Sequence, residues 1–361
     1  MTDTTTALAI TGATDADYAR LGIARDTIAL WEDGARTDGN SGTYEWWYFD
    51  AHLDDGTKLV VVFMDKELTA PQKPLGPLIR INLDLPDGRS FQKIQTFAPE
   101  MYSAAADHAD VRIADNRFEG DLHRYRISAA IDDIRVDVLL TGQVPAWRPE
   151  TGCMLFGADQ SLEFCWLPSV PQGAVEARFS IGDETHQAGG VGYHDHNWGN
   201  VALPDIIHDW YWARGQAGPY STITSYITSH KKYGYAAIPI FMLAKDGEIV
   251  AGDATKVSFE REDVYTDTTT GKPVAGVTRY TYADGEDRYV VTFTRRQDLA
   301  RDRMIEDIHG LKRLAATLVR FDGAYLRFSG ECRVQVFRAG ALVEEHADEA
   351  IWELMYFGHA R

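Results

Sequence analysis

Cysteine and basic residues are the scarce components of this chain of 361 residues. Its three cysteines, Cys153, Cys165 and Cys332, are odd in number and form no CxxC pair, so we expect buried, reduced thiols and neither a disulfide framework nor a zinc site. Lys and Arg total 36 against 54 Asp and Glu, which gives a formal net charge of −18. Phosphate binding needs a concentrated basic face, so the balance argues against nucleic acids and anionic membranes. It favours a neutral or apolar small molecule as ligand, although net charge also serves solubility.

Targeting segments and cofactor motifs are missing as well. The first ten residues lack a basic segment followed by an apolar one, so we expect no secretory signal and a cytoplasmic location. No stretch approaches the roughly 18 apolar residues of a membrane span. The sequence contains no P-loop, GxSxG elbow, GxGxxG after a strand, or HExxH. Nucleotide cofactors and a serine nucleophile therefore have no support.

Most of the sequence consists of apolar or alternating segments with the length of a β-strand. Hydrophobic content of 45% is enough for a substantial core, and the length favours two domains. Alternating or apolar runs recur at 58–64, 80–85, 135–140, 175–181, 222–228, 240–243, 277–282, 289–293, 324–328 and 332–337. The turn signals 54–56, 86–88 and 246–247 separate such runs, as hairpins do. Only 298–318 has a helical pattern, which Gly310 interrupts. The pattern predicts an all-β protein of the sandwich or barrel type.

The chain is predicted to consist of three parts. Residues 1–40 are polar and rich in Thr and Asp, and we expect them to form an arm on the body of the protein. Two β domains follow, at 41–208 and 209–361. Residues 145–171, which carry Trp147 and Trp166, are too irregular for a strand pair and are predicted to form a loop.

The segment Gly192-Tyr-His-Asp-His-Asn-Trp-Gly199 is the strongest candidate for chemistry. In an extended backbone, His194, His196 and Trp198 share one face, and Tyr193, Asp195 and Asn197 share the other. The surrounding glycines indicate a bulge or a close approach of backbone. Two histidines with the nearby His208-Asp209 also allow a metal site, but a third and a fourth ligand are not evident. An acid–base role suits His and Asp better, and a purely structural role for buried His and Asp is the alternative.

Two further segments predict cavity walls. Trp46 and Tyr48 would share one strand face, with Glu45, Trp47 and Phe49 on the other. Such rings line apolar pockets or stabilise a developing cation, unless they only fill a barrel. Further along, alternation gives a face rich in hydroxyl groups, which is either a pocket wall or an outward polar face; it comprises Tyr220, Thr222, Thr224, Tyr226 and Thr228.

Three ordered blocks resemble the carotenoid 1,2-hydratase (hydroxyneurosporene synthase) family, which includes fungal lipocalin-like Diels–Alderases and hydratases of plant compounds. These blocks are Tyr44-Glu-Trp-Trp-Tyr-Phe49, Gly190 to Gly199, and Trp210-Tyr-Trp-Ala-Arg214 with Gly218-Pro-Tyr-Ser221. The resemblance implies two tandem lipocalin-like antiparallel β-barrels packed on each other, with at most one or two short helices and a ligand pocket near their interface. It also implies no metal and no organic cofactor.

The hydratases of this family carry a His and a Trp that His196 and Trp198 match, and a Tyr that Tyr226 matches. They have an Asp two residues after that Tyr, where this chain has Thr228. A threonine hydroxyl is too weak an acid to protonate an alkene. Either another acid, such as Asp195 or Glu45, supplies the proton, or this chain catalyses a ring closure, which needs mainly positioning.

The resulting hypothesis is a cofactor-free enzyme that acts on an apolar polyene, isoprenoid, polyketide or aromatic molecule. It would catalyse hydration or dehydration of a C=C bond, or cyclisation or isomerisation, so it would be a lyase or an isomerase. His196 would be the acid–base group, Asp195 its orienting partner or a structural strut, and Tyr226 and Thr228 would bind an oxygen function. The predicted substrate-lining residues are Trp46, Tyr48, Trp198, Trp210, Trp212, Tyr220 and His194. The alternative is a non-catalytic lipocalin-type carrier, and a cupin-like metalloenzyme is the third hypothesis.

Overall fold

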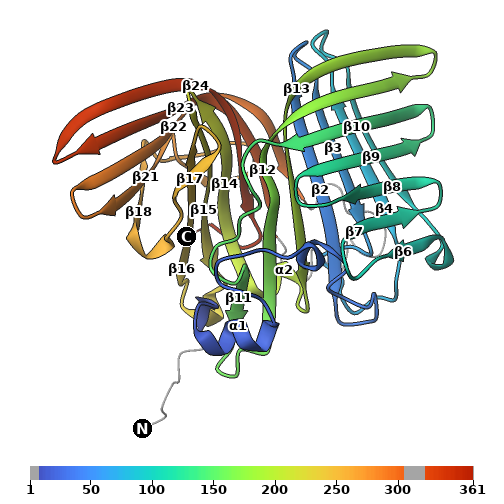
Figure 1. Ribbon diagram of the computed structural model, residues 1–361, viewed down its shortest axis with the longest axis horizontal. Helices are drawn as coiled ribbons and strands as arrows, with labels where there is room; N and C mark the ends of the chain where they lie inside the picture. The colour runs from blue at the N-terminus through green and yellow to red at the C-terminus, as the bar shows by residue number, and fades with distance from the viewer. Residues whose placement is uncertain (1–7, 305–321, 361) are drawn as a thin grey trace. The chain divides into compact units, whose positions relative to one another are not determined.

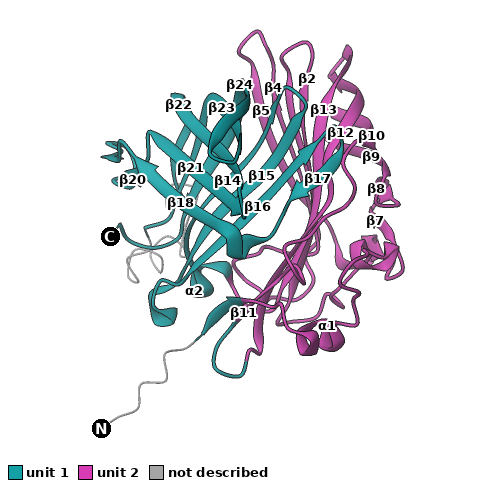
Figure 2. Cartoon of the chain, turned by 60° about the vertical axis from the view of Figure 1, so that its left-hand side comes forward, with its two compact units in different colours: residues 1–10, 156–159, 203–361 teal, residues 11–155, 160–202 magenta. Residues whose placement is uncertain are grey.

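The computed structural model describes residues 8–304 and 322–360, and most of its regular structure is β (Figure 1). The chain forms two compact units, shown in different colours in Figure 2. Unit 1 comprises the described parts of 1–10, 156–159 and 203–361, and unit 2 comprises 11–155 and 160–202. Each unit is built around its own sheet.

The first sheet has 13 strands in the described part of the chain, with the order β5-β4-β3-β2-β13-β12-β10-β9-β8-β7-β6, and β11 pairs with both β12 and β1. The antiparallel path joins neighbours in sequence except where β13 closes onto β2 and where β12 pairs with β10. The strands are β1 (Ala9–Thr11), β2 (Tyr44–Leu53), β3 (Lys58–Met64), β4 (Leu78–Asp84), β5 (Ser90–Thr96), β6 (Tyr102–Ala104), β7 (Ala109–Ile113), β8 (Asn116–Gly120), β9 (Arg124–Ile131), β10 (Ile134–Gly142), β11 (Cys153–Phe156), β12 (Leu162–Ile181) and β13 (Glu184–Gly199).

The second sheet belongs to unit 1 and has nine described strands in the order β17-β16-β15-β14-β24-β23-β22-β21-β18. Here β24 returns to pair with β14, as β13 does with β2. The strands are β14 (Ile207–Ala217), β15 (Tyr220–Ser229), β16 (Ala237–Lys245), β17 (Glu248–Ala251), β18 (Val257–Glu262), β21 (Val277–Asp284), β22 (Asp287–Arg303), β23 (Ala324–Arg338) and β24 (Ala341–Tyr356), and β19 (Tyr265–Thr266) pairs separately with β20 (Pro273–Val274).

The three predicted hairpins are confirmed. They connect β2 to β3, β4 to β5 and β16 to β17. At the last of them, Asp246 and Gly247 both have positive φ, at 51° and 86°, which a two-residue turn matched to the twist of the strands requires. Asp and Gly tolerate this conformation better than other residues do.

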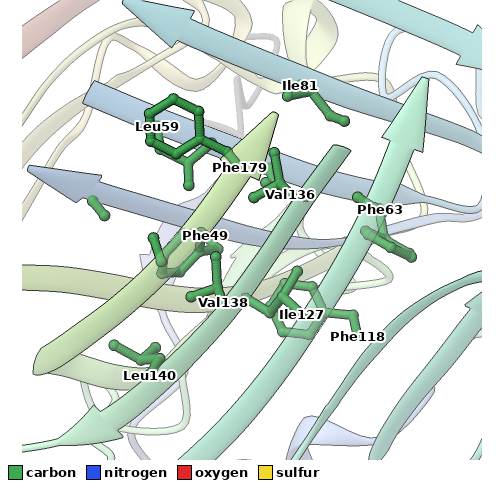
Figure 3. Close-up of a cluster of buried hydrophobic side chains, with 14 of the residues drawn as sticks. Phe49, Leu59, Phe63, Ile81, Phe118, Ile127, Val136, Val138, Leu140 and Phe179 are labelled. Atoms are coloured by element: carbon green, nitrogen blue, oxygen red, sulfur yellow. The ribbon is translucent and has the colours of Figure 1, made fainter. Parts of the chain in front are cut away.

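Alternating apolar residues of the first sheet fill the interior of unit 2. Figure 3 shows part of this core, with Phe49, Phe63 and Phe118 among side chains that are wholly buried. Unit 1 has a separate core that includes Tyr211, Phe293 and Trp352. Each sheet therefore supplies a buried apolar core to its own unit.

The predicted all-β class is confirmed: two large antiparallel sheets account for the fold. The described residues contain two short α-helices, α1 (Asp15–Leu21) and α2 (Leu203–Ile206). Neither helix has the length to cross a membrane. The predicted helix at 298–318 is wrong over 298–303, where β22 continues and pairs with β23, because cross-strand pairing outweighs local propensity. Residues 305–318 of that prediction lie outside the described residues.

Two predictions around residue 160 are also wrong. Residues 145–171 contain β11 and the start of β12, and Pro168 and Pro171 shift the register of β12 instead of ending it. Cys153 and Cys165, predicted to be reduced, form a disulfide, because β11 and β12 lie side by side and bring together cysteines that are 12 residues apart. Cys332 is a free, buried thiol, as predicted.

Gly190 lies where the backbones of β13 and β2 come close together. A Cβ atom at Gly190 would lie 2.3 Å from the carbonyl oxygen of His52 and 2.7 Å from the Cα of Leu53, and neither backbone atom can move without disturbing the ladder. We expect Gly190→Ala to lower the free energy of unfolding by about 1–3 kcal/mol in chemical denaturation. The control is Gly76→Ala, whose new Cβ would lie 3.8 Å from its nearest neighbour, the carbonyl oxygen of Pro74. Equal stability of the two variants would contradict this account.

Candidate functional site

The pairing of β13 with β2 sets the geometry of the candidate motif. Its register is unbroken from Gly190 to Gly199, with His196 opposite Trp47 and Asp195 opposite Tyr48. The predicted alternation is confirmed, because the histidines contact the core of unit 2 while Asp195 bonds to side chains on the other face. One short segment therefore serves two separate networks.

His196 lies on the interior face with no exposed surface. Its ring stacks on Trp47 with centroids 4.5 Å apart, and Trp198 lies at 4.9 Å. The Nε2 atom is 2.8 Å from Oε1 of Glu45, and the Nδ1 atom is 3.5 Å from Oδ1 of Asp33. The imidazole thus bridges two buried carboxyl groups.

Both carboxyl oxygens of Glu45 accept hydrogen bonds. Its two oxygens receive the backbone N–H groups of Arg36 and Thr37 and the Thr37 hydroxyl, at 2.5 to 3.0 Å. These donors satisfy an ionised carboxylate, so the Nε2 of His196 carries the proton that it shares with Glu45. The backbone N–H of Glu45 donates in turn to Asp65, and burial raises the pKa of that carboxyl to about 7.

His194 forms the other half of the interior network. Its Nδ1 is 2.8 Å from the carbonyl oxygen of Tyr48, which can only accept, so Nδ1 must carry a hydrogen. Its Nε2 is 3.3 Å from Oδ2 of Asp33. Both ring nitrogens of His194 therefore face oxygen acceptors.

Asp33 is the centre of this network and was not identified from the sequence. Its oxygens accept the hydroxyls of Ser169, at 2.7 Å, and Tyr125. Burial alone would raise the pKa of Asp33, but the rings of His194 and His196 and the Tyr125 hydroxyl hold it below its ordinary value. We call Asp33, Glu45, Tyr125, Ser169, His194 and His196 the interior network.

Asp195 has different partners on the opposite face. One oxygen accepts the Nε1–H of Trp166 and the hydroxyl of Tyr193, both at 2.7 Å, and the other accepts the Asn197 amide, also at 2.7 Å. Asp195 retains 7% exposure, whereas His196 has none. Burial raises the pKa of Asp195 to about 6, against the opposing effect of its hydrogen bonds. The group is therefore an acid that gains and loses its proton close to neutral pH.

Aromatic rings surround Asp195 and define what we call the aromatic face. Trp46 stacks between Tyr44 and Phe164 with centroid distances of 5.8 Å, and Tyr48 lies edge-on to Tyr193 at 6.3 Å. Trp46 and Tyr48 also pack against an aliphatic cluster on β3 and β4, formed by Val60, Val62, Met64 and Leu78. The face also carries Asp50, which is buried and accepts the Tyr48 hydroxyl at 3.2 Å, so apolar and π surfaces surround two carboxyl groups.

The predicted pairing of Asp195 with His196 is wrong. Adjacent residues of a strand point to opposite faces, and β13 has no bulge here that would bring the two side chains together. Glu45 and Asp33 orient the His196 ring instead. His194, predicted to line the substrate, lies in the interior network, while Trp46 and Tyr48 lie on the aromatic face with Asp195.

The remaining predicted site residues belong to unit 1, and the structure does not gather them into one cluster. Trp210 donates to Glu353 at 3.1 Å, Trp212 is half-buried, and the Tyr220 hydroxyl donates to Glu344 at 2.8 Å. Tyr226 stacks on Phe259 at 4.1 Å. Thr228 lies opposite Asp209 on β14, and its hydroxyl donates to that carboxylate at 3.3 Å.

Asp33→Asn tests the interior network. The substitution removes the negative charge between two imidazole rings but preserves the shape of the side chain, and unpairing a buried ion costs about 3–5 kcal/mol. We expect that loss in the free energy of unfolding, measured by chemical denaturation at pH 7. The control is Asp133→Asn in the β9–β10 turn, where the side chain is exposed and the change should stay within about 0.5 kcal/mol. A similar small effect at Asp33 would show that the network does not hold the unit together.

Known proteins resemble this chain in both sequence and fold. A quinolone epoxide rearrangement protein of Emericella nidulans is 32% identical over 196 residues, which cover 51% of this chain and 54% of that protein. A hydroxyneurosporene dehydrogenase of Chlorobaculum tepidum is 28% identical over 48% of this chain and 53% of its own length. The matched regions thus span about half the length of these curated relatives.

Solved structures extend the likeness of fold to nearly the whole chain. The crystal structure of CghA has a TM-score of 0.61 at 14% identity and covers 99% of this chain and 100% of its own. Kievitone hydratase from Nectria haematococca has a TM-score of 0.56 at 12% identity, with coverage of 92% and 93%. The family model described as Diels-Alderase-like matches residues 35–303, which include β2, β13 and β14. The chain therefore belongs to the Diels-Alderase-like family, as the motif resemblance implied.

Proposed function

We propose that this protein is an enzyme that protonates an apolar, unsaturated or epoxide-bearing small molecule held against the aromatic face of unit 2. Asp195 is the acid. The resulting cation or activated epoxide then takes up water, rearranges or closes a ring. This class of reaction requires a proton donor, a dry surface and π surfaces that tolerate positive charge.

The environment of Asp195 is the observation that carries the proposal. An ordinary aspartic acid is ionised above pH 4 and has no proton to give at neutral pH. Burial raises the pKa of Asp195 to about 6, so about a tenth of the molecules keep this proton at pH 7, against about one in a thousand for an ordinary aspartic acid. The side chains of Tyr193 and Trp166 donate to one of its oxygens and stabilise the carboxylate that remains after transfer. An acid with these partners can both donate the proton and recover it.

The names of related proteins support the same class of chemistry. One relative is described as a quinolone epoxide rearrangement protein, and a structural neighbour is a kievitone hydratase. Epoxide opening and hydration both begin readily with protonation of the substrate. Another relative is a Diels-Alderase of Acremonium, 25% identical over 54% of this chain, and ring closure of that type depends mainly on positioning. Substrates with a proton-accepting group therefore suit Asp195 best.

In this proposal, the role of His196 is to hold β13, the strand that carries Asp195, in position. Its ring is wholly buried against Trp47 and is bridged to Glu45 and Asp33, so it fixes the strand on which Asp195 stands. Trp46 and Tyr48 supply the surface next to the acid. The role proposed for Asp195 needs no contribution from Tyr226 or Thr228.

Asp195→Asn tests the proposal with a quinolone epoxide and a conjugated polyene as substrates and mass spectrometry of the products. Rotation of the Asn197 amide lets the variant keep its hydrogen bonds, so it should fold. We expect turnover to fall by about 100-fold or more, the usual contribution of a positioned general acid. The control is Asp183→Asn in the exposed β12–β13 turn, which should turn over normally.

The pH profile separates a general acid from a merely structural group. Because the acid must be protonated, the rate of the wild-type enzyme should fall about tenfold per pH unit above a pKa near 6, while the residual rate of Asp195→Asn should be flat across that range. Wild-type turnover by the variant would refute the role of Asp195. Tight binding of both compounds without conversion by any variant would instead identify a carrier.

A further inference from the structure

A second carboxyl group, Asp50, lies on the aromatic face of unit 2 and has no role in the function proposed above. It is 6% exposed, close to the 7% of Asp195, whereas His196 on the opposite face has no exposed surface. The Tyr48 hydroxyl donates to Oδ2 of Asp50 at 3.2 Å. Burying an acidic side chain among rings and aliphatic groups is costly to the fold and is common at functional sites.

The sequence around Asp50 repeats the pattern around Asp195. Strand β2 carries Tyr48-Phe-Asp50 and strand β13 carries Tyr193-His-Asp195. The antiparallel pairing sets Tyr48 opposite Asp195 and Tyr193 opposite Asp50. In each strand the tyrosine donates to the aspartate two residues further on, because both side chains point to the same face. Two Tyr–Asp pairs therefore lie head to tail on one surface.

This arrangement brings the two carboxyl groups within reach of one small molecule. Asp50 and Asp195 are diagonal neighbours in the ladder, and such neighbours lie about 7–8 Å apart. Burial raises the pKa of the Tyr193 hydroxyl, and the charges of Asp195 and Asp50 add to that effect. Both carboxyl groups therefore lie near the same hydroxyl.

The surface beside Asp50 is aliphatic. On β3, Val60 lies opposite Asp50 and Val62 lies opposite Tyr48. Both valines belong to the cluster against which Trp46 and Tyr48 pack. Trp46 and Tyr48 are half-buried, so the rings of this face are partly open to solvent. An apolar molecule held against the face meets both carboxyl groups among rings and aliphatic side chains.

Protonation of an epoxide leaves a second step to be completed. When one C–O bond opens, the resulting cation either adds water or loses a proton from a neighbouring carbon. The apolar surroundings of the two carboxyl groups disfavour the addition of water. The oxygen that gains a proton and the carbon that loses one are different atoms of the ligand, so two separate carboxyl groups suit the two proton transfers.

We propose that Asp50 is the general base that completes the reaction begun by Asp195, so that the site isomerises an epoxide to an allylic alcohol. This inference rests on the function proposed above. The epoxide oxygen takes the proton of Asp195 as its C–O bond breaks. A C–H bond next to the cation then breaks, its electrons form the C=C bond, and Asp50 takes the proton. Both carboxyl groups retain exposed surface, and exchange with water restores their starting states.

The test uses 1-phenylcyclohexene oxide, whose cation forms beside the aryl ring and next to a carbon that carries hydrogens. The reaction is run in water labelled with heavy oxygen. Mass spectrometry then compares the allylic alcohol, an isomer of the substrate, with the diol, which contains labelled oxygen. We expect the wild-type protein to form mainly the allylic alcohol. Asp50→Asn should still open the epoxide but should lower the ratio of allylic alcohol to diol about 100-fold, because the base is lost.

The matched control is Asp54→Asn in the exposed β2–β3 turn, which should keep the wild-type ratio. Thermal denaturation checks that Asp50→Asn folds, and Asp50→Ser replaces it if it does not. A wild-type ratio in the folded variant, or formation of the diol alone by the wild type, would overturn the role of Asp50 and leave that of Asp195 intact. Consumption of the epoxide by Asp195→Asn at the wild-type rate would refute the acid instead, and no consumption by the wild type would refute both.

Discussion

The unbroken register between β2 and β13 is the constraint on which the rest of unit 2 depends. It places Glu45 and Trp47 beside Trp198 and His196, and it places Trp46 and Tyr48 beside Asn197 and Asp195. A shift of one residue would bring the histidines to the aromatic face and Asp195 into the core. The approach of Gly190 to the His52 carbonyl helps to fix this register, because no side chain fits there.

The two networks differ in what they contribute. Placing charged groups in an apolar core is expensive unless they are hydrogen bonded. Ser169, Tyr125 and the backbone N–H groups of Arg36 and Thr37 supply such bonds to Asp33 and Glu45. The interior network therefore connects segments that are far apart in the sequence. Asp195 reduces stability instead: between about pH 4 and pH 6 the folded protein keeps a proton that the unfolded chain has lost, so stability falls as pH rises through that window. Such a cost is common at functional sites.

Local patterns predicted much of this organisation. Alternation identified both faces of the motif, the turn signals marked three hairpins, and the motifs identified the family. Partners distant in sequence were not predictable. Asp33 lies in a short 3-10 helix of a polar segment, 161 residues before His194, and no periodic pattern marks it. The disulfide depends on β11 lying beside β12, and Asp209 meets Thr228 only through the pairing of β14 with β15.

The protonation state of Asp195 is the central claim of this account, and infrared spectroscopy of protein labelled with ¹³C-aspartate measures it directly. The difference between wild type and Asp195→Asn isolates this one carboxyl group. We predict a protonated carboxyl band at pH 5 that disappears with a midpoint near pH 6, as the raised pKa requires. A carboxyl group that is already ionised at pH 5 would contradict the account.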